Sequence, residues 1–201
     1  MLTLYDSADS GNAYKVRLVL AHLGLPWERI ALDTDNGETR TPQFLATNPN
    51  GKVPTLVLDD GEVLCESNAI LFYLATDTPL LPDDALERAR VLQWMFFEQY
   101  SHEPNIAVSR HVLKHLELTK ERRALVESKR EPGYRALGVM EEHLAHRAYF
   151  VAEQFTIADI ALYAYTHVAD EGEFDLQDFP GIRGWIARVA DQPGHVLISD
   201  D

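Results

Sequence analysis

The sequence predicts two structural units in succession, an α+β domain followed by an all-α domain. Strand-like and helix-like segments alternate up to residue 76, and strand signals are absent after it. Between the two parts, Pro79 and Pro82 stand close together and would interrupt any helix. We therefore expect domains over residues 1–76 and 83–201, joined by a short linker.

The chain begins with a predicted strand, helix and strand. Residues 2–5 alternate in polarity like a short strand. Ser10 and the residues after it have the composition of a helix start, and apolar residues then recur at helical spacing as far as Leu23. Gly24 ends this helix, and residues 27–32 form the next strand. The result is a β-α-β unit.

The rest of the first domain is predicted from turn signals and caps. Thr41 followed by proline caps a short helix. Strands over residues 53–58 and 62–65 are joined by Asp59-Asp60-Gly61, which is a hairpin turn signal. A helix over residues 68–75 completes the order β-α-β-α-β-β-α, which is that of a thioredoxin-like domain.

The second domain is predicted to be entirely helical. We expect helices over residues 85–118, 120–144, 156–168 and 181–190. Pro104 suggests an interruption of the first of these helices, and the pair Pro132-Gly133 is a helix breaker without an evident purpose in the second.

Composition excludes several classes of partner. The formal net charge of −14 argues against binding to nucleic acid or to an anionic membrane. No apolar run reaches the length of a membrane span, and the first residues lack the basic region of a signal peptide. The single cysteine, Cys65, cannot form an internal disulfide, which agrees with a reducing cytoplasm. We therefore expect a cytoplasmic protein.

The segment Asn-Pro-Asn-Gly-Lys-Val-Pro at residues 48–54 stands directly before a predicted strand. Pro54 supplies no N–H group, so it belongs to a strand start, a sheet edge or a cis bond. If the Val53–Pro54 bond is cis, the N–H and C=O groups of Val53 stay unpaired and point outward. Free backbone groups of this kind can pair with an extended peptide.

The segment Glu-Ser-Asn-Ala-Ile at residues 66–70 opens a predicted helix, with Ser67 as its N-cap. A helix N-terminus that carries a hydroxyl group suits a carboxylate, and Glu66 beside it suits an ammonium group. A site that pairs a peptide backbone and holds one carboxylate and one amine fits a small γ-glutamyl peptide.

These two segments, followed by Phe-Thr-Ile-Ala-Asp-Ile-Ala at residues 155–161, resemble the motifs of the cytosolic glutathione transferase family in their order along the chain. Residues 10–17 are similar to the bacterial serine-type, theta/nu-like members. The resemblance covers nearly the whole chain and implies the glutathione transferase fold. It also implies glutathione as co-substrate, a small hydrophobic electrophile as second substrate, and a homodimer.

Ser10 is the first candidate for catalysis. Its position after the first strand and before the first helix places its hydroxyl near the positive end of that helix. A thiolate of glutathione bound there would be stabilised, which lowers the pKa of the thiol. Related bacterial members have Thr and Asn at the positions that match Ser10 and Asn12, so Asn12 is the second candidate. The alternative interpretation of Ser10 is a plain helix cap.

Lys52 directly precedes the Val53–Pro54 pair, and its ammonium group is a candidate partner for the glycyl carboxylate of glutathione. Arg40 is less specific, because a solvated surface charge explains it equally well. The predicted binding residues are Lys52, Val53, Pro54, Glu66 and Ser67.

The other reactive side chains have simpler interpretations. Tyr5 and Ser7 are second choices for thiol activation, and core packing is expected for Tyr5. Cys65 is expected to pack in the sheet as a small hydrophobe. The histidine pairs 111/115 and 143/146 lack further ligands, so no metal site is expected.

The motif residues of the second domain have a structural interpretation. Thr156 and Asp159 are expected to form a buried helix cap rather than a catalytic pair. Weak candidates for contact with the second substrate are Tyr100, His102, Arg110 and His111.

The predicted function is therefore that of a glutathione transferase, which activates the thiol for attack on an electrophilic hydrophobic substrate in detoxification. Alternatives on the same thiolate are peroxide reduction, isomerisation and disulfide reduction. A non-catalytic, transferase-like regulatory protein is the alternative from another class. The presence of Ser10, Asn12, Glu66 and Ser67 argues against loss of the site. The electrophile is not predicted, because its pocket comes from variable helices and loops.

Overall fold

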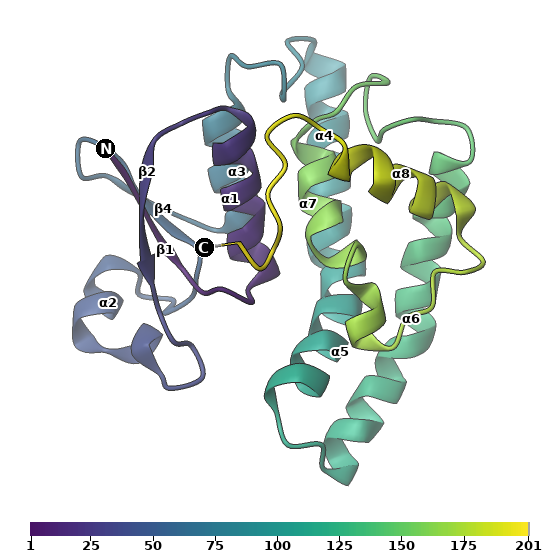
Figure 1. Ribbon diagram of the computed structural model, residues 1–201, viewed down its shortest axis with the longest axis horizontal. Coiled ribbons are helices and arrows are strands. Elements are labelled where there is room, and N and C mark those ends of the chain that lie inside the picture. The colour runs from purple at the N-terminus through teal and green to yellow at the C-terminus, as the bar shows by residue number, and fades with distance from the viewer. Residues whose placement is uncertain (201) are drawn as a thin grey trace. The chain divides into compact units, whose positions relative to one another are not determined.

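The computed structural model describes residues 1–200, which divide into two compact units. The first contains Met1–Thr76 and the chain from Pro193 onward, and the second contains Asp77–Gln192 (Figure 1). The first unit is a four-stranded sheet with helices and the second is helical, which confirms the predicted fold class. The predicted second domain, 83–201, extended too far, because the chain from Pro193 packs with the first unit.

The sheet of the first unit has the strand order β2-β1-β3-β4. Strand β1 (Leu2–Asp6) pairs in parallel with β2 (Trp27–Ala31) and antiparallel with β3 (Thr55–Val57). Strand β4 (Val63–Cys65) closes the sheet as the antiparallel partner of β3. Leu4 and Leu56 are opposite each other in the register and are fully buried, so the centre of the sheet is part of the core.

Three α-helices accompany this sheet, together with the short 3-10 helix η1 (Glu38–Arg40): α1 (Gly11–His22), α2 (Pro42–Thr47) and α3 (Ser67–Ala75). Helices α1 and α3 pack against each other, whereas α2 lies apart from them (Figure 1). Polar side chains start two of these helices, because the Oγ of Ser10 accepts from the N–H of Ala13 and Thr41 caps α2 in the same way.

The second unit is built from helices α4 (Ala85–Phe97), α5 (Glu103–His115), α6 (Lys120–Leu144), α7 (Ile157–Thr166) and α8 (Pro180–Ala190), with a short 3-10 helix η3 (Ala169–Gly172). The predicted interruption near Pro104 takes the form of a π-helical turn, η2 (Glu98–His102), between α4 and α5. Pro104 lies in the first turn of α5, where no intrahelical N–H bond is needed. No helix in the described chain combines the length and apolar character of a membrane span.

The predicted breaker pair Pro132-Gly133 does not end α6, which continues through it. Gly133 is required by packing, because a Cβ atom at this position would lie 2.5 Å from Cζ of Phe174. The glycine therefore allows the ring of Phe174 to rest against the helix, where Tyr134 meets it edge-on.

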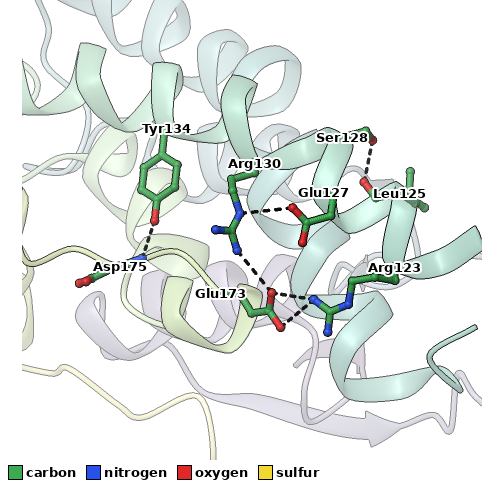
Figure 2. A network of polar contacts seen from close by, with 8 residues as sticks. All are labelled: Arg123, Leu125, Glu127, Ser128, Arg130, Tyr134, Glu173 and Asp175. Atoms are coloured by element: carbon green, nitrogen blue, oxygen red, sulfur yellow. Dashed lines mark hydrogen bonds and ion pairs between the residues drawn. The ribbon is translucent and has the colours of Figure 1, made fainter. Parts of the chain in front are cut away.

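A polar network beyond Phe174 joins α6 to the segment that follows η3 (Figure 2). Nη1 of Arg123 donates to both carboxylate oxygens of Glu173 at 2.9 and 2.8 Å. Arg130 lies 3.6 Å from the same carboxylate, and the Tyr134 hydroxyl accepts from the N–H of Asp175 at 2.9 Å. These pairs are partly exposed, so each is expected to contribute at most about 1 kcal/mol.

The predicted cap at Thr156 and Asp159 is confirmed as a capping box at the start of α7. The buried carboxylate of Asp159 accepts from the N–H and hydroxyl of Thr156, from the N–H of Phe150 and from the indole of Trp185. Burial raises the pKa of Asp159 to about 6, and the hydrogen bonds oppose that shift. This side chain holds three segments of the helical unit together.

Candidate functional site

The segment before β3 is shaped by a buried asparagine. Asn48 donates from Nδ2 to the carbonyl of Lys52 and to the hydroxyl of Thr55, both at 2.9 Å. Its Oδ1 accepts from the N–H of Asn50 at 3.0 Å. One amide side chain therefore closes the turn from both ends and fixes where the strand begins.

Gly51 allows this turn to lie close to the preceding segment. Its φ of +62° is in the region that favours glycine, and an added Cβ would lie 2.9 Å from the carbonyl oxygen of Thr39. Arg40, an alternative to Lys52 in the sequence, donates to the carbonyl of Asn50 at 3.1 Å. Its guanidinium supports the turn from outside.

Val53 follows this turn and lies before the first residue of β3. The Val53–Pro54 peptide bond is cis, as predicted. Within residues 1–200, neither the N–H nor the C=O group of Val53 has a hydrogen-bond partner, and the exposed ammonium of Lys52 has no ion pair. Backbone groups for pairing with a peptide and a cation for a carboxylate are therefore adjacent.

The start of α3 differs from the prediction in one respect. The N-cap is Glu66 rather than Ser67, and Ser67 is the first helical residue. Glu66 has a φ of 68°, an unusual conformation for a residue with a side chain, which costs on the order of 1–3 kcal/mol. This backbone conformation leaves the Glu66 carboxylate exposed and turns Ser67 inward, where its side chain is almost completely buried.

Asn12 and Ser67 meet although they come from different motifs. The Ser67 hydroxyl donates to Oδ1 of Asn12 at 3.2 Å, and the same oxygen accepts from the buried ammonium of Lys15 at 2.8 Å. The first turn of α1 is thereby tied to the first turn of α3. The part that Lys15 plays in this contact is not evident from the sequence, because nothing local distinguishes it from any other helical lysine.

Ser10 is the N-cap of α1, and its half-buried hydroxyl oxygen accepts from the N–H of Ala13 at 3.2 Å. Its hydroxyl hydrogen has no acceptor in the described chain. The cap interpretation of Ser10 is therefore correct, and it leaves the hydrogen free to donate to a ligand. A hydroxyl that accepts from the helix and donates outward suits an anion.

The sheet register brings the three segments to one place. Thr55 is opposite Tyr5 on β1 and Cys65 on β4. Because both pairings are antiparallel, the chain after β1, the chain before β3 and the chain after β4 all leave the sheet at the same end. The predicted residues near 10, 53 and 67 therefore belong to one end of the sheet.

The second-choice residues lie near the same end of the sheet and make structural contacts there. The ring of Tyr5 packs edge-on against Phe44 at 5.4 Å, as expected for a core residue. The carbonyl of Ser7 accepts from the N–H of Ser10, which closes a turn. Burial raises the pKa of the Cys65 thiol, which disfavours a reactive thiolate.

The candidate residues of the helical unit lie in different environments, two of them buried and two exposed. His102 is buried and its Nε2 lies 2.9 Å from the hydroxyl of Thr166, while Arg110 pairs with Glu171 at 2.6 Å. Tyr100 and His111 are exposed. Residues 1–200 contain no group of three or more side chains arranged to hold a metal ion.

Comparison with known families identifies the class of protein. The family model of the glutathione S-transferase N-terminal domain matches residues 1–76, and that of the C-terminal domain matches residues 92–193. The chain belongs to the glutathione S-transferase family.

Similar proteins include a glutathione S-transferase and a transcriptional regulator. Glutathione S-transferase 2 of Schizosaccharomyces pombe is 32% identical over 95% of this chain and 91% of its own length. Protein URE2 of Candida glabrata is 30% identical, and Transcriptional regulator URE2 of Saccharomyces cerevisiae is 28% identical. The alignment with each URE2 protein covers 95% of this chain but only 65% of the relative.

Two solved structures are similar to this chain over nearly its whole length. A glutathione S-transferase from Pseudomonas fluorescens is 52% identical with a TM-score of 0.97, and the match covers 99% of both chains. Ure2p in complex with glutathione is 29% identical with a TM-score of 0.88, covering 96% of this chain and 95% of that chain.

Proposed function

We propose that this chain is a glutathione transferase that binds glutathione at the end of the sheet near Ser10, Val53 and Ser67. The observation that carries the proposal is the hydrogen bond between Ser67 and Asn12, which joins the first turn of α3 to the first turn of α1, directly after Ser10. The solved structure of a relative, Ure2p, in complex with glutathione supports glutathione as the ligand.

Each part of glutathione has a partner of suitable chemistry in this proposal. The unpaired backbone groups of Val53 pair with the central peptide, as in strand addition. The first turn of α3, with Ser67, holds the γ-glutamyl carboxylate, while the exposed carboxylate of Glu66 holds the ammonium group. Lys52 neutralises the glycyl carboxylate, and Pro54 lines the site beside Val53.

Ser10 activates the thiol in this proposal. The free hydroxyl hydrogen donates to the sulfur, and the donation is stronger when the sulfur is a thiolate. The pKa of the bound thiol is therefore lowered, and the thiolate attacks the electrophile. Asn12 remains the second candidate, because its Oδ1 accepts from Lys15 and Ser67 and any donation to the thiolate would come from its Nδ2 group.

The second substrate in this proposal is a small hydrophobic electrophile. The protein is a serine-type, theta/nu-like member that acts in the cytoplasm as a homodimer, in detoxification. Support for the catalytic assignment comes from the likeness to the transferases of S. pombe and P. fluorescens.

A second candidate function is that of a non-catalytic regulatory protein. The likeness to Transcriptional regulator URE2 favours it, although the chain spans only 65% of that protein. The two candidates differ in whether thiol chemistry accompanies glutathione binding.

The test is retention on immobilised glutathione, followed by turnover assays with an aryl halide, an organic peroxide and a mixed disulfide. We expect retention, elution by free glutathione, and turnover of the aryl halide. Turnover of the peroxide or the disulfide alone would place the activity in the alternative class of thiolate chemistry. Retention without any turnover would favour the regulatory function, and absence of both would refute the proposal.

A further inference from the structure

The chain from residue 193 to residue 200 runs beside α1 (Figure 1). It is held by side chains of that helix that donate to its backbone carbonyls. The Tyr14 hydroxyl donates to the carbonyl of Val196 at 2.7 Å, and Nδ1 of His22 donates to that of Pro193 at 2.8 Å. Backbone oxygens accept these hydrogen bonds, and Nε2 of His195 in the segment also lies 3.4 Å from the Tyr14 hydroxyl.

Arg17 makes the most extensive of these contacts, and its side chain is only 4% exposed. Its Nη2 donates to the carbonyl of Ile198 at 2.9 Å, and its Nη1 donates to that of Asp200 at 2.6 Å. The same Nη2 donates to the carbonyl of Ala8 at 3.0 Å, and Nε lies 3.4 Å from the carboxylate of Asp6. One guanidinium therefore binds segment 193–200 and the chain after β1 simultaneously.

Ala8 lies in the turn that carries Ser10. The N–H of Ser10 donates to the carbonyl of Ser7 at 2.9 Å, so residues 7–10 form one closed unit. The strand before this turn is anchored, because the buried Asp6 pairs with Arg29 at 2.7 Å. The contact from Arg17 to Ala8 is therefore a direct restraint on the turn from the α1 side.

We infer that Arg17 is a positioning residue for Ser10, and that docking of segment 193–200 keeps Arg17 in the conformation that holds the turn. Without the segment, two guanidinium nitrogens lose carbonyl acceptors and the long side chain gains freedom to leave Ala8. Hydrogen-bond strength falls steeply with misalignment, and small displacements at a reacting centre have large effects on rate. The inference rests on the proposed function of Ser10.

The test is the ultraviolet absorbance of the thiolate of bound glutathione, titrated with pH in the full-length protein. Arg17→Gln removes the bridge, Arg17→Lys keeps the charge but not the geometry, and Tyr14→Phe loosens the segment without touching the turn. We expect Arg17→Gln to raise the pKa of the bound thiol by about one unit, the lower end of what loss of the Ser10 hydrogen bond would produce. Arg17→Lys and Tyr14→Phe should give smaller rises, with glutathione affinity unchanged at a pH low enough that the bound thiol is protonated in every variant.

The double variant Tyr14→Phe/Arg17→Gln should raise the pKa no further than Arg17→Gln alone, because both changes act through one contact. The control is Arg88→Gln, which removes an arginine of the helical unit that also donates to a backbone carbonyl, that of Pro82. A rise in this control would attribute the effect to general destabilisation and overturn the inference.

The remaining outcomes distinguish the role of Arg17 and segment 193–200 from the proposed function of Ser10. If the pKa of the bound thiol is lowered in the wild type and is equally low in every Arg17 and Tyr14 variant, the inference is overturned and the proposed function stays intact. A rise in the Arg17 variants without one in Tyr14→Phe overturns the role of segment 193–200. An unperturbed thiol pKa in the wild type overturns both proposals.

Discussion

The Ser10 hydroxyl caps a helix and can also donate a hydrogen bond to a ligand. Its oxygen accepts from the N–H of Ala13, and its hydrogen is available to a ligand beside a helix N-terminus. Asn12, by contrast, uses its oxygen to connect Lys15 and Ser67. The two residues therefore differ in their hydrogen bonds, and the choice between them as thiol activators is decided by the variants described next.

Replacing Ser10 by alanine is expected to leave glutathione binding nearly intact and to reduce turnover strongly at about pH 6.5. A hydroxyl bond to the thiolate would lower the pKa of the thiol from about 8.5 by roughly one to two units. Turnover of the variant should therefore recover partly as the pH approaches about 9. Kinetics across this range, compared with Asn12→Ala, provide the measurement, and a pH-dependent loss only in Asn12→Ala would reverse the assignment.

Replacing Ser67 by alanine is expected to weaken glutathione binding by roughly 1–3 kcal/mol. We expect the Ser67 hydroxyl to turn from Oδ1 of Asn12 to the γ-glutamyl carboxylate when glutathione binds, and the variant cannot form that hydrogen bond. Titration calorimetry measures the change. Ser128→Ala is a matched control, since that hydroxyl only donates to the carbonyl of Leu125 on α6 (Figure 2). Equal dissociation constants for the wild type and Ser67→Ala would remove Ser67 from the site.

At the scale of single elements, α6 contains two glycines in different surroundings. A Cβ on Gly133 would overlap the ring of Phe174, whereas a Cβ on Gly138 would meet no atom within 4 Å. Gly133→Ala is expected to destabilise the protein by about 1–3 kcal/mol through overpacking. Gly138→Ala is expected to stabilise it by up to about 1 kcal/mol through helix propensity.

Urea unfolding of the two variants checks this pair of predictions. A stabilising effect of Gly133→Ala would show that Phe174 moves aside at no cost, and would contradict the packing reason given for the glycine.

The capping box of α7 predicts a pH dependence. The pKa of Asp159 is raised to about 6, so the folded protein binds a proton more readily than the unfolded chain does. The stability that comes from this protonation is fully present below the unfolded pKa of 3.8 and is lost as the pH rises through about 6. Asp159→Asn cannot titrate and serves as the reference.

We therefore expect the free energy of unfolding of the wild type, minus that of Asp159→Asn, to decrease between about pH 5.5 and 7.5. This range stays above the sequence pI of 4.9, where solubility is lowest. A difference that stays constant or increases would contradict the raised pKa.

At the scale of the whole molecule, the elements of both units followed from local signals. Turn residues such as Asp59-Asp60-Gly61 and caps such as Thr156 act over a few residues, so sequence reasoning located them. It misread Gly133, because the ring that requires the glycine, Phe174, lies far along the chain. It assigned Ser67 as the cap because serine is a common N-cap, whereas Glu66 takes that position with an unusual φ.

The long-range parts of the site could not be predicted from sequence. The contact between Asn12 and Ser67 depends on the packing of α1 against α3, and the contacts of Arg17 with Ile198 and Asp200 join residues from opposite ends of the chain. No local pattern carries information of this kind. The order of the motifs indicated that the segments near residues 10, 53 and 67 form one site. The sheet register explains this, because it places all three segments at the same end of the sheet.

The central claim is that glutathione binds at the end of the sheet where the chain leaves β1 and β4 and enters β3. The most direct test is a nuclear magnetic resonance titration of the amide groups of the full-length, isotope-labelled protein with glutathione. We predict the largest shifts at the amides of Ser10, Asn12, Val53 and Ser67, and no comparable shifts near Gly133 or Phe174. Shifts confined to residues 77–192, or no shifts at saturating glutathione, would contradict the claim.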